Sequence, residues 1–180
     1  WLASNDLSLD LALFHHRYDD IVMTQAATPF FDPELGLLRG DFTYQNLASA
    51  RSHGAELSLR TLWGNGWSSE LNYSYLDVDV ATAPAQAASA DGLEGSAPRH
   101  QVVLHNRWTI NDTWQANLWL HWRDELHNAT TQIDARSDAD LGIRWQYSEA
   151  LDLWLMIRNV TDNDDPDFFG STRARHGRST

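Results

Sequence analysis

Hydrophobic and polar residues alternate along most of the chain, and this alternation is the first guide to its structure. In LDLWLMIRNVTD, from Leu151 to Asp162, leucine or isoleucine occupies each odd position up to 157, while the even positions include Asp152 and Arg158. Successive strand residues point to opposite faces, so this strand has one apolar face and one mixed face. The apolar face contacts either a protein core or membrane lipid, and one strand does not distinguish the two.

The same alternation predicts an all-β chain of about seven strands. No segment keeps a helical spacing of apolar residues for longer than one turn. We expect strands at residues 7–18, 42–63, 67–80, 100–110, 113–124, 136–147 and 151–161. In the second strand, the sequence SARSHG at 49–54 predicts a bulge or another irregularity.

Short and long connections alternate between the expected strands. Short turns are expected at 64–66, 111–113 and 148–150, and long loops at 19–41, 81–99, 125–135 and from 162 onward. All five prolines fall in the long loops, where a missing N–H breaks no sheet hydrogen bond. This arrangement is typical of an antiparallel up-and-down meander that crosses a membrane.

Aromatic residues on the apolar faces border every short turn. They are Trp63 and Trp67 at the first turn, Trp108 and Trp114 at the second, and Trp145 and Tyr147 before the third. Tryptophan and tyrosine gather where lipid headgroups meet hydrocarbon, whereas a soluble core holds its largest rings near mid-strand. A second aromatic belt is expected near Trp122 and Tyr75. At ~3.3 Å per residue and a tilt of about 40°, this spacing spans roughly 20 Å, close to the ~25 Å apolar band of outer-membrane barrels.

Composition and charge narrow the possible functions. The net charge of −12 argues against nucleic acid as a partner, because phosphate binding needs clustered basic residues. The chain has no cysteine, so disulfides and thiolate metal sites are excluded. A mean hydropathy of −0.48, without any run of apolar residues long enough for a spanning helix, excludes a transmembrane helix.

No motif for catalysis, a resident metal or a cofactor stands out, so we expect a protein that is not an enzyme. His15 and His16 are adjacent in a strand and point to opposite faces, so they do not chelate one ion. The acidic stretch at 162–167 departs from a calcium loop and is interpreted as a solvated loop. Candidate ligand contacts on the polar face and outer loops are His121, Arg123, Tyr44 and Arg99.

Several segments resemble, in order, the C-terminal barrel of TonB-dependent outer-membrane receptors. They are DLALFHHRYDDIV (10–22), YQNLASARSHGAELSLR (44–60), ELNYSYLDVDV (70–80), SAPRHQVVLHNRW (96–108) and LMIRNVTDNDDPDFFG (155–170). The most specific are N-x-A-x-A-x-x-x-G-x-E, from Asn46 to Glu56, and RNVTD, from Arg158 to Asp162.

The resemblance implies an antiparallel transmembrane segment of a 22-stranded barrel in the bacterial outer membrane, with an N-terminal plug in its lumen. It also implies a receptor that binds a scarce ligand, most often a ferric siderophore, and imports it with energy from the TonB complex. Residues 1–180 would be a partial C-terminal barrel domain without the plug and the last strand. Because both lateral edges would be unpaired in lipid, we expect no stable pore from this piece alone.

Two alternatives remain open from the residues themselves. A soluble carbohydrate-binding β-sandwich would bury the leucine faces in a core. A passive porin-type barrel would share the wall pattern but lack a plug.

Overall fold

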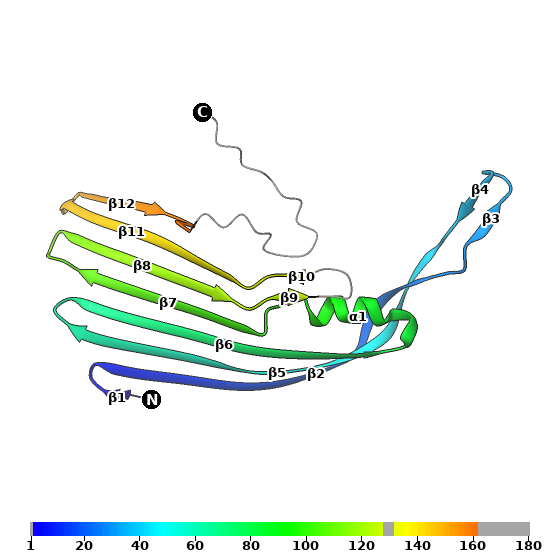
Figure 1. The fold of residues 1–180 in the computed structure, drawn as a ribbon, viewed down its shortest axis with the longest axis horizontal. Coiled ribbons are helices and arrows are strands. Elements are labelled where there is room, and N and C mark those ends of the chain that lie inside the picture. The colour runs from blue at the N-terminus through cyan, green and yellow to red at the C-terminus, as the bar shows by residue number, and fades with distance from the viewer. Residues whose placement is uncertain (1, 128–131, 162–180) are drawn as a thin grey trace.

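The computed structural model describes residues 2–127 and 132–161, most of which form one antiparallel sheet (Figure 1). Its eight strands lie in the order β1-β2-β5-β6-β7-β8-β11-β12, so strands that follow one another along the chain lie side by side. They are β1 (Leu2–Ser4), β2 (Leu7–Ala26), β5 (Phe42–Gly64), β6 (Trp67–Thr82), β7 (His100–Thr109), β8 (Trp114–Arg123), β11 (Arg136–Ser148) and β12 (Leu151–Ile157). The order confirms an up-and-down meander, with β1 and β12 as the edges of an open wall.

Seven of these strands correspond to the seven expected ones, and β2 shows the largest difference in length. β2 runs eight residues past the predicted end at Tyr18, because its distal part pairs with the start of β5 from Phe42 to Asn46. The expected acidic loop at 162–167 and the chain end, where a closing strand was expected to be missing, lie outside the described residues.

The predicted irregularity at 49–54 is confirmed at the start of this stretch, in the pairing of β5 with β2. The register of that pair shifts between Tyr18 and Val22 on β2, opposite Asn46 to Ala50 on β5, whereas β5 pairs with β6 in unbroken register from Ala48 to Leu62. Asp20 has a positive φ of 60° at this point. Gly54, at the end of this stretch, lies where two strands pack closely. A Cβ there would collide with the ring of Phe14 and the carbonyl oxygen of Tyr75, so the glycine makes room for a close-packed strand.

The long loops contain secondary structure that the alternation did not predict. The first carries a hairpin of β3 (Phe30–Asp32) and β4 (Leu37–Arg39), which projects as an arm (Figure 1). The second carries η1 (Pro84–Gln86) and α1 (Ala87–Glu94), and the third carries the short pair β9 (Leu126–His127) and β10 (Gln132–Ile133). The alanine-rich sequence AASADGLE explains the helix, because alanine has the highest helix propensity.

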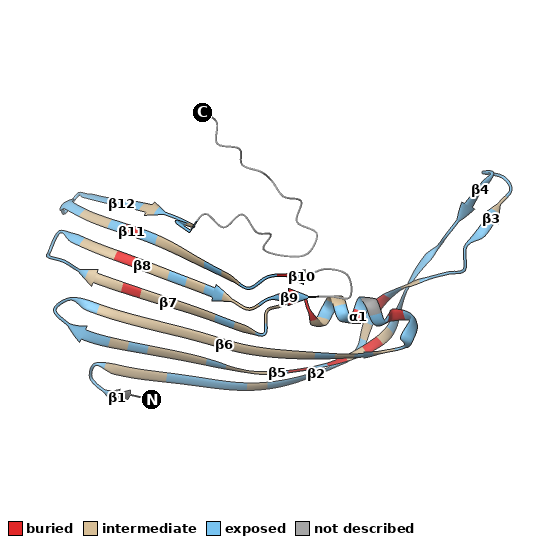
Figure 2. Ribbon diagram, in the orientation of Figure 1, coloured by how far each residue is buried: buried red, intermediate tan, exposed pale blue. Residues whose placement is uncertain are grey.

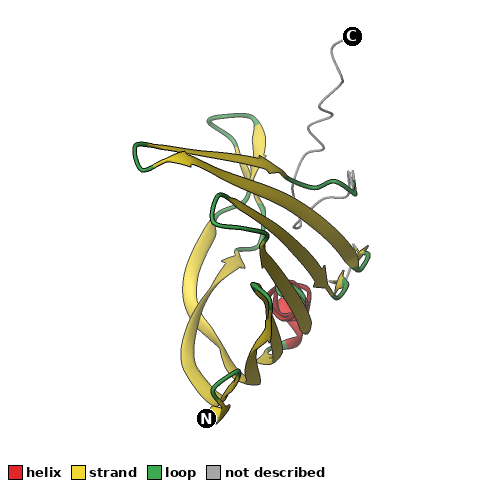
Figure 3. Ribbon diagram, turned by 90° about the vertical axis from the view of Figure 1, so that its left-hand side faces the viewer, coloured by secondary structure: helices red, strands yellow, loops and turns green. Residues whose placement is uncertain are grey.

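The buried apolar side chains gather at the long-loop end of the sheet, whereas buried Asn106 and Asn117 lie on β7 and β8 nearer the short turns (Figure 2). The buried apolar residues among those described are Met23, Ala48, Ala50, Ala90, Leu126 and Ile133. Seen along the strands, the sheet is a curved single layer with the helix beside it (Figure 3). In the described part of the chain, no helix is both long and apolar enough to cross a membrane.

Candidate ligand-binding surface at the mouth of the barrel wall

The two faces of the sheet differ sharply in polarity. Five leucines, Leu9, Leu59, Leu71, Leu104 and Leu120, lie directly opposite one another on five neighbouring strands and form one row of the apolar face. Nothing in the described chain covers this face, and Leu13 and Leu155 on it are 74% and 63% exposed. A face of this size stays uncovered only if lipid or another apolar phase contacts it.

The other face is mixed and carries most of the charged side chains of the strands. One of its rows consists of Arg60, Glu70, His105, Trp119 and Asp140, again directly opposed on neighbouring strands. Arg144 donates to Asp152 from Nη2 and Nε at 2.6 and 2.8 Å on the same face. The helical segment lies over this face at the long-loop end, where Ala50, Ser52 and Gln86 are buried together. It is therefore the lumen face.

Tryptophan rings at the short turns form a hydrogen-bonded girdle on the apolar face. Trp67 stacks on Trp63 and on Trp108, with ring centroids 5.3 and 6.1 Å apart. Asn106 and Ser69 interrupt the apolar pattern, but they lie opposite each other, and Asn106 Oδ1 accepts hydrogen bonds from Ser69 Oγ (2.6 Å) and Trp67 Nε1 (3.3 Å). Trp63 Nε1 also donates to Ser69 Oγ at 2.9 Å. The polar side chains of Asn106 and Ser69 therefore find hydrogen-bond partners within the apolar face.

A second aromatic belt lies at the opposite edge of the apolar band, as the spacing predicted. Tyr75 contacts His100 and His53, with ring centroids 5.1 and 6.2 Å apart. Tyr73 shares a hydrogen bond of 2.8 Å with Nδ1 of His100. The two belts bound the apolar band and place the long loops at one end of the wall, which we call the mouth.

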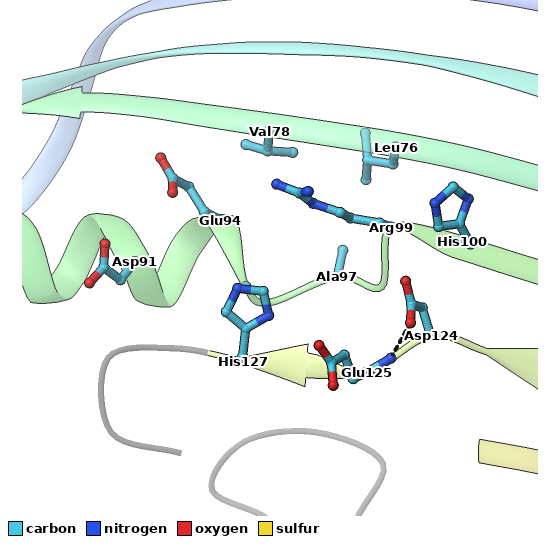
Figure 4. Close-up of a pocket in the computed structure, with 11 residues that line it drawn as sticks. Leu76, Val78, Asp91, Glu94, Ala97, Arg99, His100, Asp124, Glu125 and His127 are labelled. Atoms are coloured by element: carbon cyan, nitrogen blue, oxygen red, sulfur yellow. Dashed lines mark hydrogen bonds between the residues drawn. The ribbon is translucent and has the colours of Figure 1, made fainter. Parts of the chain in front are cut away.

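A cavity of about 540 Å³ opens at the mouth beside α1 (Figure 4). Its wall comes from β6, the C-terminal half of α1, the segment leading into β7, and the segment from β8 into β9. The lining is charged and mixed with apolar groups: Leu76, Val78, Asp91, Glu94, Gly95, Ala97, Arg99, His100, Asp124, Glu125 and His127. Glu94 fixes the helix against the wall, because its carboxylate accepts a hydrogen bond of 2.6 Å from the backbone N–H of Val80.

The four residues predicted to contact a ligand are only partly brought together. His121 and Arg123 lie two residues apart on the lumen face of β8, and His121 Nε2 is 3.7 Å from a carboxylate oxygen of Asp140. Arg99 lines the cavity and pairs with Asp77 at 3.2 Å. Tyr44 is 78% exposed on the distal part of β5 and is not among the residues that line the cavity.

An aromatic cluster on the lumen face was missed by the sequence reasoning. His105 stacks on Trp119 with centroids 4.5 Å apart and planes at 6°, and Trp154 meets Trp119 edge to face. Both tryptophan rings close over Gly142, where a Cβ would lie within 2.9 to 3.2 Å of them. The available signal was the presence of tryptophan at polar-face positions of two strands. Asn117, 4% exposed beneath this cluster, accepts from His105, and its Nδ2 has no partner.

Metal binding finds no support within residues 2–127 and 132–161, where no three His, Asp or Glu side chains are grouped to hold an ion. His15 lies opposite His53, while His16 stacks against Phe14. The two adjacent histidines therefore point to different faces, as predicted.

Known proteins with this architecture identify the family. The family described as TonB dependent receptor-like, beta-barrel matches residues 1–160. Among curated protein sequences, none matches. Solved structures with the same fold include the ferric enterobactin receptor PfeA of Pseudomonas aeruginosa (TM-score 0.68, 18% identity), which is covered over 24% of its length by 89% of this chain.

Two further solved structures have the same fold. The ferric-catecholate import receptor Fiu of E. coli K12 has a TM-score of 0.63 and 17% identity, over 91% of this chain and 22% of that one. The pyoverdine outer-membrane receptor FpvA of Pseudomonas aeruginosa PAO1 has a TM-score of 0.66 and 15% identity, over 89% and 24%. The chain thus spans about a quarter of the length of these receptors, which are bacterial outer-membrane proteins. It belongs to the TonB-dependent receptor family and forms part of the wall of the outer-membrane β-barrel.

Proposed function

We propose that this chain is the part of a TonB-dependent receptor wall that receives a ferric siderophore at the mouth, for import with energy from the TonB complex. The observation that carries the proposal is the cavity of about 540 Å³ beside α1, which has the size of a small-ligand site. Its position supports the same function, because it lies at the loop-rich end of the wall and beyond the apolar band. The receptors of similar fold, for ferric enterobactin, ferric catecholates and pyoverdine, support iron chelates as the ligand class.

Ligand contacts are proposed at the lumen side of the mouth. Arg99 lines the cavity itself, and His121 and Arg123 lie on the lumen face of β8, which leads into Asp124 and Glu125 in the cavity wall. We therefore propose Arg99 as a direct contact and His121 and Arg123 as contacts of a ligand that extends from the cavity along β8. The cavity offers apolar surface at Leu76 and Val78 and hydrogen-bonding groups around it, the combination that small-ligand sites use for affinity and orientation. Tyr44 would contact the ligand only on its way to the mouth.

Uptake of radiolabelled iron tests the proposal in cells that carry the full-length receptor containing this chain as their only route for a given ferric siderophore. We expect uptake that stops when the TonB complex is deleted. Uptake that persists without TonB would instead indicate passive diffusion through a porin-type barrel.

Side-chain variants test the ligand contacts separately. Arg123→Gln and Arg99→Gln are expected to raise the ligand concentration for half-maximal uptake, while Arg39→Gln on the exposed arm is expected to leave it unchanged. If the arm variant has the same effect as the two mouth variants, the ligand is not bound at the cavity.

A further inference from the structure

The lining of the cavity at the mouth has an excess of negative charge (Figure 4). It contains four carboxylates, one guanidinium group and two imidazoles. The guanidinium group belongs to Arg99, and Asp77, which is outside the lining, already pairs with it at 3.2 Å. The single permanent positive charge of the lining is therefore shared with a further acid. The four carboxylates belong to Asp91, Glu94, Asp124 and Glu125.

The C-terminal end of α1 adds to this negative charge. The last turn of the helix holds Asp91 and Glu94 but no basic residue. A helix carries a partial negative charge at its C-terminal end, which favours cations and disfavours acids there. A Cβ at Gly95 would collide with the carbonyl oxygen of His127, so this end of the helix lies directly against β9 and forms part of the cavity wall. A cation in the cavity would thus be stabilised by the two acids and by the helix end together.

Basic side chains of the described residues do not neutralise the four carboxylates. Glu94 accepts a hydrogen bond of 2.6 Å from a backbone N–H, and Glu125 accepts one of 2.8 Å from the side-chain amide of Gln132, so both donors are uncharged. Arg123, at the end of β8, donates to the backbone carbonyl of Asp124 at 3.3 Å. In the described part of the chain, none of the four carboxylates forms an ion pair, so their negative charge is available to a ligand.

Iron chelates differ in charge according to the groups that hold the metal. Each catecholate contributes two negative charges and each hydroxamate contributes one. An Fe³⁺ ion with three catecholates is therefore a trianion, whereas an Fe³⁺ ion with three hydroxamates is neutral. Charges interact more strongly beside a protein than in bulk water, because the effective dielectric constant is lower. The acidic lining therefore disfavours the trianion.

We propose that the chelate received in this cavity is of the hydroxamate type, with an uncharged iron centre and a positively charged group at its periphery. This inference rests on the proposed function of the cavity and specifies its ligand. The cationic group lies against Asp124, Glu125 and the C-terminal end of α1, while Arg99 donates hydrogen bonds to hydroxamate oxygens. The similarity to the ferric-catecholate receptor Fiu, at 17% identity, shows a common fold, and the charge of the lining decides between the two kinds of chelate.

Equilibrium binding of iron chelates to the full-length receptor in detergent tests the inference. The probes are the ferric complexes of one linear trihydroxamate with a free terminal amine, of its N-acetyl form and of its N-succinyl form, which share the iron centre and are cationic, neutral and anionic. A ferric tris-catecholate is the fourth probe. We expect affinity to fall in this order, by at least about tenfold from the amine to the succinyl form, and the difference to shrink as salt is raised. Equal affinity of the three hydroxamates, or tighter binding of the tris-catecholate, would overturn the inference.

Variants of the acids locate the effect. Asp124→Asn with Glu125→Gln should weaken binding of the cationic chelate by about tenfold and leave the N-acetyl form unchanged. Asp91→Asn should act in the same direction by a smaller factor, and it removes an acid from the negative end of a helix, so it does not destabilise the fold. Asp112→Asn, in a short turn at the opposite end of the wall, is the control and should change neither affinity. If the double variant does not fold, unchanged binding of the cationic chelate to Asp91→Asn would count against the inference.

A variant that fills the cavity separates this inference from the proposed function. Ala97 lines the cavity, so Ala97→Trp should weaken binding of all three hydroxamate chelates regardless of their charge. If it does so but the three chelates bind equally well to the unmodified receptor, the cavity is the binding site and only the inference about charge is wrong. If Ala97→Trp changes no affinity, or if no iron chelate binds, the proposed function of the cavity fails and this inference fails with it.

Discussion

The two ends of the wall bury hydrophobic residues in different ways. At the short turns, the sheet is regular, its leucines are uncovered, and stacked tryptophans mark the edge of the apolar band. At the mouth, the chain adds a helix, a hairpin arm and a register shift, and the few buried apolar residues gather there. The membrane covers the first region, whereas the second must bury its apolar groups against protein. The same hydrophobic effect therefore yields a bare sheet at one end and a packed structure at the other.

The largest expected effect comes from a charge placed on the lipid-facing side of the wall. Leu59 lies in the middle of the leucine row, so Leu59→Arg places a charge near the bilayer centre and should lower the free energy of unfolding by about 2–4 kcal/mol. Urea unfolding of the full-length receptor in lipid vesicles measures it. Ser58→Arg, one residue away on the lumen face, is the control and should change the stability little. Similar losses for both variants would mean that the faces are assigned wrongly.

A smaller effect is expected where the two lumen tryptophans close over a glycine. Gly142→Ala places a methyl group against the rings of Trp119 and Trp154, and the rings must shift. We expect a loss of about 1–2 kcal/mol in the same unfolding measurement and a change in tryptophan fluorescence. Gly92→Ala in α1, which has open space around it, is the matched control and should be neutral or stabilising. Equal stability of the two variants would show that the rings do not pack over Gly142.

The polar interruption within the girdle gives a third test. Asn106 and Ser69 satisfy each other on the apolar face, so a double-mutant cycle of Asn106→Leu and Ser69→Ala should give a coupling of about 1 kcal/mol. A coupling near zero would mean that lipid headgroups or water satisfy the two side chains separately.

The smallest effect concerns the attachment of α1 at the mouth. Glu94→Ala removes the acceptor of the Val80 amide, so hydrogen exchange of that amide should become roughly fivefold faster, equivalent to about 1 kcal/mol. Asp91→Ala on the same helix is the control, because its carboxylate accepts no hydrogen bond from a described residue. Unchanged exchange in Glu94→Ala would show that the helix is held by its apolar contacts alone.

The regular part of the wall could be predicted from the sequence because the alternation of apolar and polar residues can be followed within each strand alone. Alternation in β8 and β11 assigns each side chain to a face without knowledge of any other strand, and the tryptophans at the turns identify the solvent of each face. Even Asn106, which weakened the pattern of β7, matters little once its partner Ser69 is found on the neighbouring strand.

The mouth could not be predicted to the same extent because it depends on contacts between distant segments. The extension of β2 to Ala26 requires pairing with residues near Phe42, and the cavity requires α1 to approach the start of β9. Alternation does not encode these contacts. Tyr44 was predicted as a ligand contact from the sequence and is not among the residues that line the cavity, so its contact with a ligand stays a prediction.

The girdle also records the geometry of the complete barrel. Trp67 lies opposite Trp108 and Trp114 opposite Trp145, but Trp108 lies opposite Ala116, two residues further from the turn than Trp114. From β6 to β8, the belt therefore steps by two residues over two strand spacings. Two residues of ~3.3 Å over two strand spacings of ~4.8 Å correspond to an inclination of roughly 35°. Rings held at one headgroup depth thus require each strand to be staggered against its neighbour, and this stagger is the shear with which a sheet closes into a barrel. The open wall formed by this chain already has the shear of a closed barrel.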